Sequence, residues 1–223
     1  MQTTIKKSVL VGVGLLGISG LTQAAELTAN VGVTSNYVFR GATQTDDGPA
    51  VQGGVDYTHD SGLYAGAWAS NVEITPGDNG FETDLYAGYN FKLNEAVTFD
   101  VGYIAYLYHS TNDFDASEIY FGASFKDFTA TYYVGSTDGP GNTDYNYVDL
   151  KYSLVLPQDF TLHLHYGNMD VDVGTDYEDA SIGISKKVSE FDIGLTATTI
   201  DYDGNTSDEN EIFVTATKTF KLQ

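Results

Sequence analysis

Two histidines of this chain share one face of a candidate β-strand, and they are the first residues to test for chemistry. His163 and His165 are two residues apart and alternate with Leu162 and Leu164, so in a strand both side chains point to the same side. A metal such as zinc needs about four ligands, and the sequence does not place two more beside this pair. We therefore predict no metal site and no cofactor, and interpret the histidines as residues that line a pore.

Histidine–serine pairs are the remaining candidates for catalysis. His59 lies near Ser61, and His109 precedes Ser110. A serine nucleophile needs a base and a carboxylate or amide in register. His59 is expected in a tight turn and His109 at a longer loop, and neither pair resembles an activated nucleophile. The sequence therefore predicts no catalytic residue, and we expect that the protein is not an enzyme.

Arg40 is the only arginine in the chain. Its parity with Asn30, Gly32 and Thr34 predicts a side chain that points inward. Two interpretations stay open: Arg40 ties neighbouring carboxylates into a wall network, or it forms part of a constriction that sets ion preference. Lys151 follows Asp149 on one strand and is expected to pair with it. By the same parity the inward acids are Asp56, Glu82, Asp84, Asp100, Glu118, Asp149, Asp179 and Asp192.

These residues need elements to position them, and period-2 alternation predicts about twelve antiparallel strands, although ten would also be compatible. The links between the strands alternate between tight turns, such as Asp60-Ser61 and Lys126-Asp127, and longer Gly-, Asn- and Asp-rich stretches such as Gly41–Pro49. Sorting short turns to one rim and long loops to the other is typical of outer-membrane barrels. The expected strands are 27–39, 50–59, 62–71, 81–92, 96–109, 116–125, 128–136, 145–156, 160–168, 177–187, 190–201 and 210–221.

Each expected strand has one apolar face and one polar or small face. In 190–201, Phe191, Ile193 and Leu195 alternate with Asp192, Gly194 and Thr196. In hydrocarbon a closed barrel turns its apolar face to lipid, so the polar face lines a wet lumen; a soluble up-and-down barrel with an apolar interior is the alternative. Aromatic residues near strand ends predict girdles at the membrane interfaces, namely Tyr37, Phe39, Tyr89, Phe91, Phe99, Phe125, Phe128, Tyr145, Phe191 and Phe220.

The beginning of the chain predicts export. Lys6 and Lys7 precede an apolar run, and Ala24 ends a segment of small residues, which is the pattern of a secretory signal peptide. Residues 1–24 are therefore expected to be the signal peptide and residues 25–223 the barrel. The formal net charge of −21 becomes still more negative when Lys6 and Lys7 are removed. Nucleic acid is excluded as a partner, because binding it requires basic residues that neutralise phosphates.

Several motifs in the first mature residues resemble one family. They are SNYVFRG at 35–41, QTDDGPAVQGGVDY at 44–57, GLYAGAWASNV at 62–72 and ETDLYAGY at 82–89. Together they resemble the TorF family of proteobacterial porins. The resemblance implies a signal peptide, an outer-membrane barrel and a channel. It implies no substrate, cofactor or catalytic residue.

The sequence therefore predicts an outer-membrane channel for passive diffusion of small solutes or ions, with a cation preference set by the excess of inward acids. The alternatives are a non-conducting structural or adhesive barrel and a lipid-modifying enzyme. Expected partners are outer-membrane lipid, lipopolysaccharide, the barrel-assembly machinery and the solutes themselves, and the oligomeric state stays open. One further hypothesis has Ca²⁺ or Mg²⁺ bridging the acidic loops to lipopolysaccharide.

Overall fold

The structure, a computed structural model, describes residues 25–223 except 74–76, 78, 110–114, 139–141 and 205–208. The expected signal peptide, Asp78, Asp113 and Ser110 lie outside the described residues. No helix in the described part of the chain is both long enough and apolar enough to cross a membrane.

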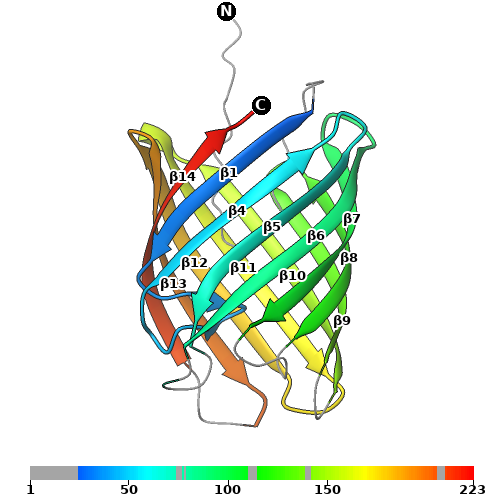
Figure 1. Ribbon diagram of the computed structural model, residues 1–223, viewed down its shortest axis with the longest axis vertical. Coiled ribbons are helices and arrows are strands. Elements are labelled where there is room, and N and C mark those ends of the chain that lie inside the picture. Colours follow the sequence, from blue (N-terminus) through cyan, green and yellow to red (C-terminus); the bar gives the residue numbers. More distant parts are fainter. Residues whose placement is uncertain (1–24, 74–76, 78, 110–114, 139–141, 205–208) are drawn as a thin grey trace, which may run out of the picture.

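Twelve antiparallel strands close into one barrel, in which every strand pairs with its neighbours in sequence and β1 pairs with β14 at the seam (Figure 1). This confirms the predicted fold class and its upper strand count. The strands are β1 Glu26–Thr34, β4 Ala50–Thr58, β5 Leu63–Val72, β6 Gly80–Lys92, β7 Val97–Tyr108, β8 Ala116–Phe125, β9 Phe128–Thr137, β10 Asp144–Val155, β11 Phe160–Val171, β12 Tyr177–Val188, β13 Phe191–Tyr202 and β14 Glu209–Lys221.

The two ends of the barrel differ in the length of their connections. The tight turns lie at one end, together with the start of β1 and the end of β14, and the longer connections lie at the other (Figure 1). One tight connection contains a single turn of 3₁₀-helix, Pro157–Asp159. We call the two ends the short-turn end and the long-loop end. The short and the long connections lie at opposite ends of the barrel, as the sequence predicts.

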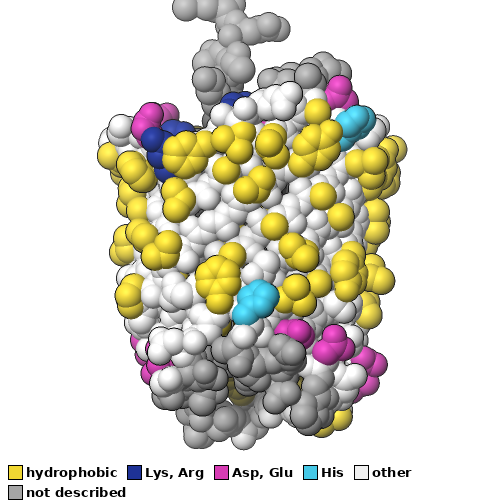
Figure 2. Space-filling view, viewed as in Figure 1, with side chains coloured by type: hydrophobic (Ala, Val, Ile, Leu, Met, Phe, Trp, Pro, Cys, Tyr) yellow, Lys and Arg dark blue, Asp and Glu magenta, His cyan; other side chains and the backbone are white. Residues whose placement is uncertain are grey.

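The wall of the barrel carries its apolar side chains outward. Val33, Ile119 and Leu195 are 52%, 62% and 48% exposed, whereas Asp84 and Asp179 on the opposite face are buried in the lumen. The outer surface in Figure 2 is accordingly covered with hydrophobic side chains, and acidic ones gather toward the long-loop end. A soluble barrel would show the reverse arrangement, so the lipid-facing interpretation holds and the soluble alternative is wrong.

The first expected strand is wrong at its end. β1 stops at Thr34 rather than at residue 39, and residues 35–49 do not form an outer loop. Instead the chain turns into the barrel, where β2 (Val38–Phe39) and β3 (Ala42–Thr43) pair as a small hairpin (Figure 1). We call residues 35–49 the inner hairpin.

The inner hairpin turns at Arg40 and Gly41, whose φ angles are 48° and 83°. Two consecutive positive φ values define the primed two-residue turn that matches strand twist. Its base is tied by side chains: Thr45 accepts a hydrogen bond from the Tyr37 amide (3.0 Å), and Asn36 accepts one from Thr43 (2.7 Å). The segment is therefore a structured element rather than an irregular loop.

The inner hairpin also corrects the predicted aromatic girdles. Tyr37 is 6% exposed, Phe39 packs against the core tyrosines, and Tyr145 is buried on the inner face, so none of the three meets lipid. The aromatic residues near the short turns do face outward, and Phe91, Phe99 and Phe121 stack along the wall. The alternation of the sequence could not show that Tyr37 and Phe39 are absent from the girdle, because it does not reveal that β1 ends at Thr34 and that both residues belong to the inner hairpin.

Candidate functional site: the barrel lumen

Arg40, at the tip of the inner hairpin, forms a bidentate ion pair with Glu118 on β8. Its two terminal nitrogens donate to the two carboxylate oxygens at 2.6 and 3.0 Å, and the side chains are only 8% and 0% exposed. Tyr106 donates a further hydrogen bond to Glu118 at 2.9 Å. The parity argument predicted that Arg40 points inward, but the hairpin, and not the strand, is what places it there.

The Arg40 guanidinium also lies against three aromatic rings. Its central carbon is 4.0 Å from the ring centre of Tyr147, 4.9 Å from that of Tyr133 and 4.8 Å from that of Phe39. Such cation–π contacts are strongest where water is excluded. Burial by itself lowers the pKa of Arg40, but the adjacent Glu118 carboxylate outweighs this and raises the pKa well above its ordinary value. The tip therefore carries a fixed positive charge that one carboxylate neutralises.

Gly41 brings the hairpin against the far wall. A Cβ atom at this position would lie 2.8 Å from Cβ of Asp179 on β12 and 2.9 Å from Cβ of Ile200 on β13. Only glycine fits so close an approach, and its positive φ reinforces the requirement. The inner hairpin thus reaches from its root at β1 and β4 to Glu118 on one side and to β12 and β13 on the other, and it narrows the lumen.

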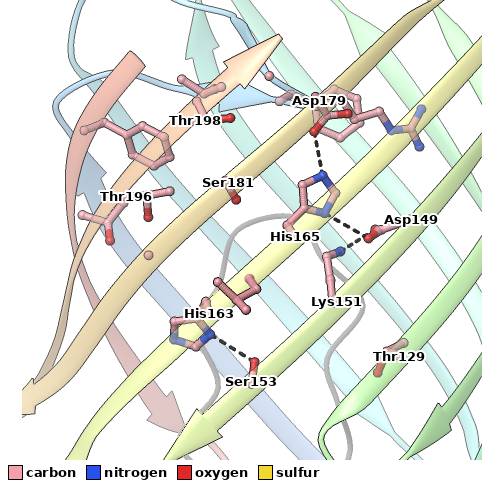
Figure 3. A pocket seen from close by; sticks show the side chains of 18 of the residues that line it. Thr129, Asp149, Lys151, Ser153, His163, His165, Asp179, Ser181, Thr196 and Thr198 are labelled. Carbon is pink, nitrogen blue, oxygen red and sulfur yellow. Dashed lines mark hydrogen bonds and ion pairs between the residues drawn. The ribbon is translucent and has the colours of Figure 1, made fainter. Parts of the chain in front are cut away.

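Beside the hairpin lies a cavity of about 440 Å³ whose wall is rich in hydroxyl groups (Figure 3). Its charged lining residues include Arg40, Lys126, Asp127, Asp149, Lys151 and Asp179, together with the imidazoles of His163 and His165. The serine and threonine hydroxyl groups come from Thr34, Thr129, Thr131, Ser153, Thr161, Ser181, Thr196, Thr198 and Thr215. Apolar and aromatic side chains such as Phe39, Trp68 and Phe213 line the rest of this partly open space.

One continuous network crosses the cavity wall. Lys151 pairs with Asp149 at 2.6 Å, as the sequence predicted. His165 bridges Asp149 (3.2 Å) on β10 and Asp179 (2.6 Å) on β12, and Figure 3 shows it between these two carboxylates. Tyr147 donates to Asp179 at 2.8 Å while its ring lies against Arg40. The network therefore connects the wall to the tip of the hairpin.

His163 occupies a different environment from His165. Its two ring nitrogens face the hydroxyl groups of Ser153 (3.1 Å) and Ser185 (2.9 Å). No group of three histidine or acidic side chains in the described part of the chain could hold a metal ion. The two histidines share the inner face, and the structure gives each its own hydrogen-bond partners.

Outside the lumen, the other two histidines lie in exposed positions. His59 contacts Ser61 at 2.9 Å within a tight turn, and His109 contacts Thr83 at 2.9 Å. Among the residues that the structure describes, no carboxylate forms a hydrogen bond or ion pair with either histidine. They lack the oriented third group that an activated nucleophile requires.

A second part of the lumen is filled by tyrosines that donate to carboxylates. Tyr64 donates to Asp100 at 2.8 Å and Tyr108 to Glu82 at 3.0 Å, and Tyr86 donates to Asp56. We call this set, with Tyr106, Tyr120 and Tyr133, the tyrosine wall. The inward acids predicted on β4, β6 and β7 therefore lie inside, but Tyr hydroxyl groups cover Asp56, Asp100 and Glu82, and these acids do not border the cavity.

The remaining predicted acids differ in their surroundings. Asp84 is fully buried, and neither of its carboxylate oxygens has a hydrogen-bond partner. Asp192 lies on β13 in register with Lys187 and Thr217, apart from the network around His165. The parity of Tyr86, Tyr106 and Tyr108 places these tyrosines on the inner face, where they narrow the lumen. The choice of Glu118 as the partner of Arg40 and the hydrogen bonds between tyrosines and carboxylates were not predicted from the sequence.

A closed twelve-strand barrel with a lipid-facing apolar surface and a polar lumen narrowed from within defines a porin-like β-barrel. The chain belongs to the Gcw_chp family, described as bacterial proteins of unknown function, whose model matches residues 19–223. No curated protein matches the sequence.

Solved structures of similar fold are outer-membrane porins and channels. The KdgM porin matches with a TM-score of 0.58 at 10% identity, covering 86% of this chain and 99% of that chain. The NanC porin matches at 0.55 and 12% identity, over 86% and 98%. An outer membrane channel from Pseudomonas putida F1 matches at 0.54 and 12% identity, over 94% and 100%. At these identities the likeness is one of fold.

Proposed function

We propose that this protein is an outer-membrane channel for the passive diffusion of small hydrophilic solutes or ions, with the inner hairpin as its constriction. The observation that carries the proposal is a hairpin tip fixed by the ion pair of Arg40 and Glu118, next to a cavity whose wall bears many hydroxyl and charged groups. Channels select by pore width and by rings of charge rather than by a catalytic step. Residues 1–24 act as the export signal in this proposal, and the long-loop end faces outward.

The proposal includes a modest cation preference. The predicted inward acids outnumber Arg40 and Lys151, and further acids such as Asp138, Asp144 and Glu209 stand at the long-loop end. Acids that tyrosines cover contribute little to the local field of the open cavity. The preference is therefore expected to arise mainly at the mouth, where solvated carboxylates raise the local concentration of cations.

The class of solute follows from the cavity wall. Its hydroxyl groups and its internally paired charges suit small polar molecules that exchange hydrogen bonds with water easily. The KdgM porin was solved in complex with disordered oligogalacturonate, with 8% identity to this chain. For the present barrel we propose only that small hydroxylated solutes can enter the cavity.

A non-conducting barrel is the second candidate, and the tyrosine wall together with the inner hairpin favours it, because both occupy lumen volume. Reconstitution of the mature protein in planar bilayers separates the two. Discrete conductance steps, together with swelling of liposomes in small sugars, are expected for the channel. Sealed bilayers at high protein load, with correctly folded barrels recovered afterwards, would instead establish the non-conducting barrel.

A further inference from the structure

Both ring nitrogens of His165 contact carboxylates. Nδ1 lies 3.2 Å from Asp149 on β10, and Nε2 lies 2.6 Å from Asp179 on β12 (Figure 3). All three side chains are largely shielded from water. A neutral imidazole has one N–H donor and one bare nitrogen. It can therefore donate to only one of the two carboxylates, and its bare nitrogen would point at an oxygen of the other.

The other contacts of the two carboxylates do not relieve this conflict. The second oxygen of Asp149 accepts a hydrogen bond from Lys151 at 2.6 Å, and the second oxygen of Asp179 accepts one from Tyr147 at 2.8 Å. The Tyr147 hydroxyl is also 3.2 Å from Nε2 of His165, but its one proton does not lie between Nε2 and Asp179. That contact needs a proton of its own. Because imidazole is a much stronger base than a carboxylate, the proton belongs to His165.

We propose that His165 is held as an imidazolium, whose positive charge makes the cavity wall electrically neutral and suppresses ion selectivity in the cavity. Together with Lys151, it offsets the charges of Asp149 and Asp179. A neutral His165 would leave one excess negative charge at a site largely shielded from water, where a charge acts more strongly than at the surface. The effect on selectivity rests on the proposed channel function, whereas the charge of His165 does not.

The other charged residues around the cavity occur as opposite charges. Arg40 is bound to Glu118 through both of its terminal nitrogens. Lys126 and Asp127, which also line the cavity, are adjacent in the tight turn between β8 and β9. Each of these cations is thus matched by an acid. The excess negative charge beside a neutral His165 would therefore not be offset elsewhere in the wall.

His163 is an internal reference, because it lies two residues away on the same face of β11. Its ring nitrogens contact the hydroxyl groups of Ser153 and Ser185 at 3.1 and 2.9 Å. A hydroxyl group can either donate or accept a hydrogen bond, so a neutral imidazole satisfies both contacts. Of the two lumen histidines, only His165 requires a charge.

The first test measures the charge of His165 directly. Nitrogen NMR of the mature barrel in detergent micelles, with isotope-labelled histidine, is recorded at neutral pH, and single His→Gln variants assign the signals. We expect two N–H protons on His165 and one on His163. The spectrum of the unmodified protein depends neither on conductance nor on the stability of a variant. A single N–H on His165 would overturn the proposal.

The second test measures selectivity as the reversal potential in a KCl gradient near 1 M, where a Debye length of about 3 Å screens the acidic mouth. At neutral pH we expect a potential near zero for the wild type and for the matched control His59→Gln, which changes a histidine outside the lumen. His165→Gln should shift the potential toward K⁺ preference, because Asp149 and Asp179 keep their charges. His165→Lys restores a positive charge and should return the potential toward zero.

Two outcomes of the second test would count against the selectivity role, and they are distinguishable. A conducting His165→Gln channel with an unchanged reversal potential would overturn this role and leave the proposed channel intact. A wild-type barrel that does not conduct would contradict the proposed function and the selectivity role with it, while the NMR spectrum still decides the charge of His165.

Discussion

Arg40 and Glu118 together decide how the centre of the lumen is charged. The pair is buried, bidentate and surrounded by aromatic rings, so neither partner can be solvated when the other is removed. Replacing a whole buried pair with apolar side chains is often tolerated, whereas removing one member exposes the full desolvation penalty of the other. The energetic value of the pair is thus best measured as a difference between single and double variants.

Replacing Arg40 with Met is expected to lower the free energy of unfolding by about 3–5 kcal/mol, because Glu118 stays buried and unpaired. The double variant Arg40→Met with Glu118→Met should recover most of that loss, since both charges are absent. Urea unfolding in detergent micelles, followed by tryptophan fluorescence, measures both. Equal destabilisation of the single and double variants would show that the aromatic contacts, and not the ion pair, hold the tip.

The inner hairpin is an element that the barrel does not need for closure. β1 pairs with β14 on one side and with β4 on the other, and Thr34 and Ala50 are directly opposite each other in that register. A tight turn could therefore replace the residues between them. Because the inner hairpin lies in the lumen and the barrel closes without it, we expect its role to be the narrowing of the lumen.

Replacing residues 36–48 with a short Gly- and Asn-containing turn should leave a folded barrel with a larger conductance. Glu118 loses its partner in this variant, but it gains water, because the hairpin no longer covers it. Heat-dependent migration on gels checks the fold, and single-channel recording checks the conductance. Shortening the 172–176 connection at the same end of the barrel is the control, and it is expected to leave the conductance unchanged.

Glycines on the inner face give the tyrosine wall its space. A Cβ atom at Gly66 would collide with the ring of Tyr86, its partner in register, and the Tyr86 hydroxyl is held by Asp56. Similar collisions would occur at Gly88 with Tyr64 and at Gly135 with Tyr145. Each tyrosine thus lies flat across a glycine of the adjacent strand, and the two residue types depend on each other.

Gly66→Ala should therefore reduce the free energy of unfolding by roughly 1–3 kcal/mol, the range for overpacking a tight interior. Gly122→Ala is the matched control, because a Cβ there would meet no tyrosine ring and would approach only the side chains of Thr131, at 3.3 Å, and Asp100, at 3.5 Å. The difference between the two variants in urea unfolding isolates the tyrosine contact from the general effect of adding a methyl group. Equal losses would mean that strand propensity accounts for both.

The strands were largely predictable because alternation is a local property: the bounds of β8 were predicted as they are observed, and most others within a few residues. The inner hairpin was not predictable from the sequence. Val38, Phe39 and Arg40 continue the alternation of β1, and only the Arg40-Gly41 dipeptide signals a turn. Contacts within one strand, such as Asp149 with Lys151, follow from spacing. The contact of Arg40 with Glu118, 78 residues away, depends on how the closed barrel and the hairpin are placed, which no local pattern encodes.

At the scale of the whole molecule, charge is distributed unevenly along the barrel axis. Lys92, Lys126 and Lys186 lie toward the short-turn end, and acids such as Asp138, Asp144 and Glu209 lie toward the long-loop end. The sequence as a whole carries a net charge of −21. A solute that enters from the long-loop end therefore meets a negative potential before it reaches the narrow part of the lumen.

This distribution predicts how ion selectivity should depend on salt. The reversal potential in a KCl gradient is expected to indicate a cation preference at low ionic strength, where the Debye length is about 30 Å at 0.01 M and the acidic mouth acts over a long distance. The preference should largely disappear near 1 M, where that length is about 3 Å. Asp138→Asn with Asp144→Asn should weaken it, whereas Asp56→Asn, which removes an acid covered by Tyr86, should not. A preference that persists at high salt and responds to Asp56→Asn would place selectivity in the tyrosine wall instead of at the mouth.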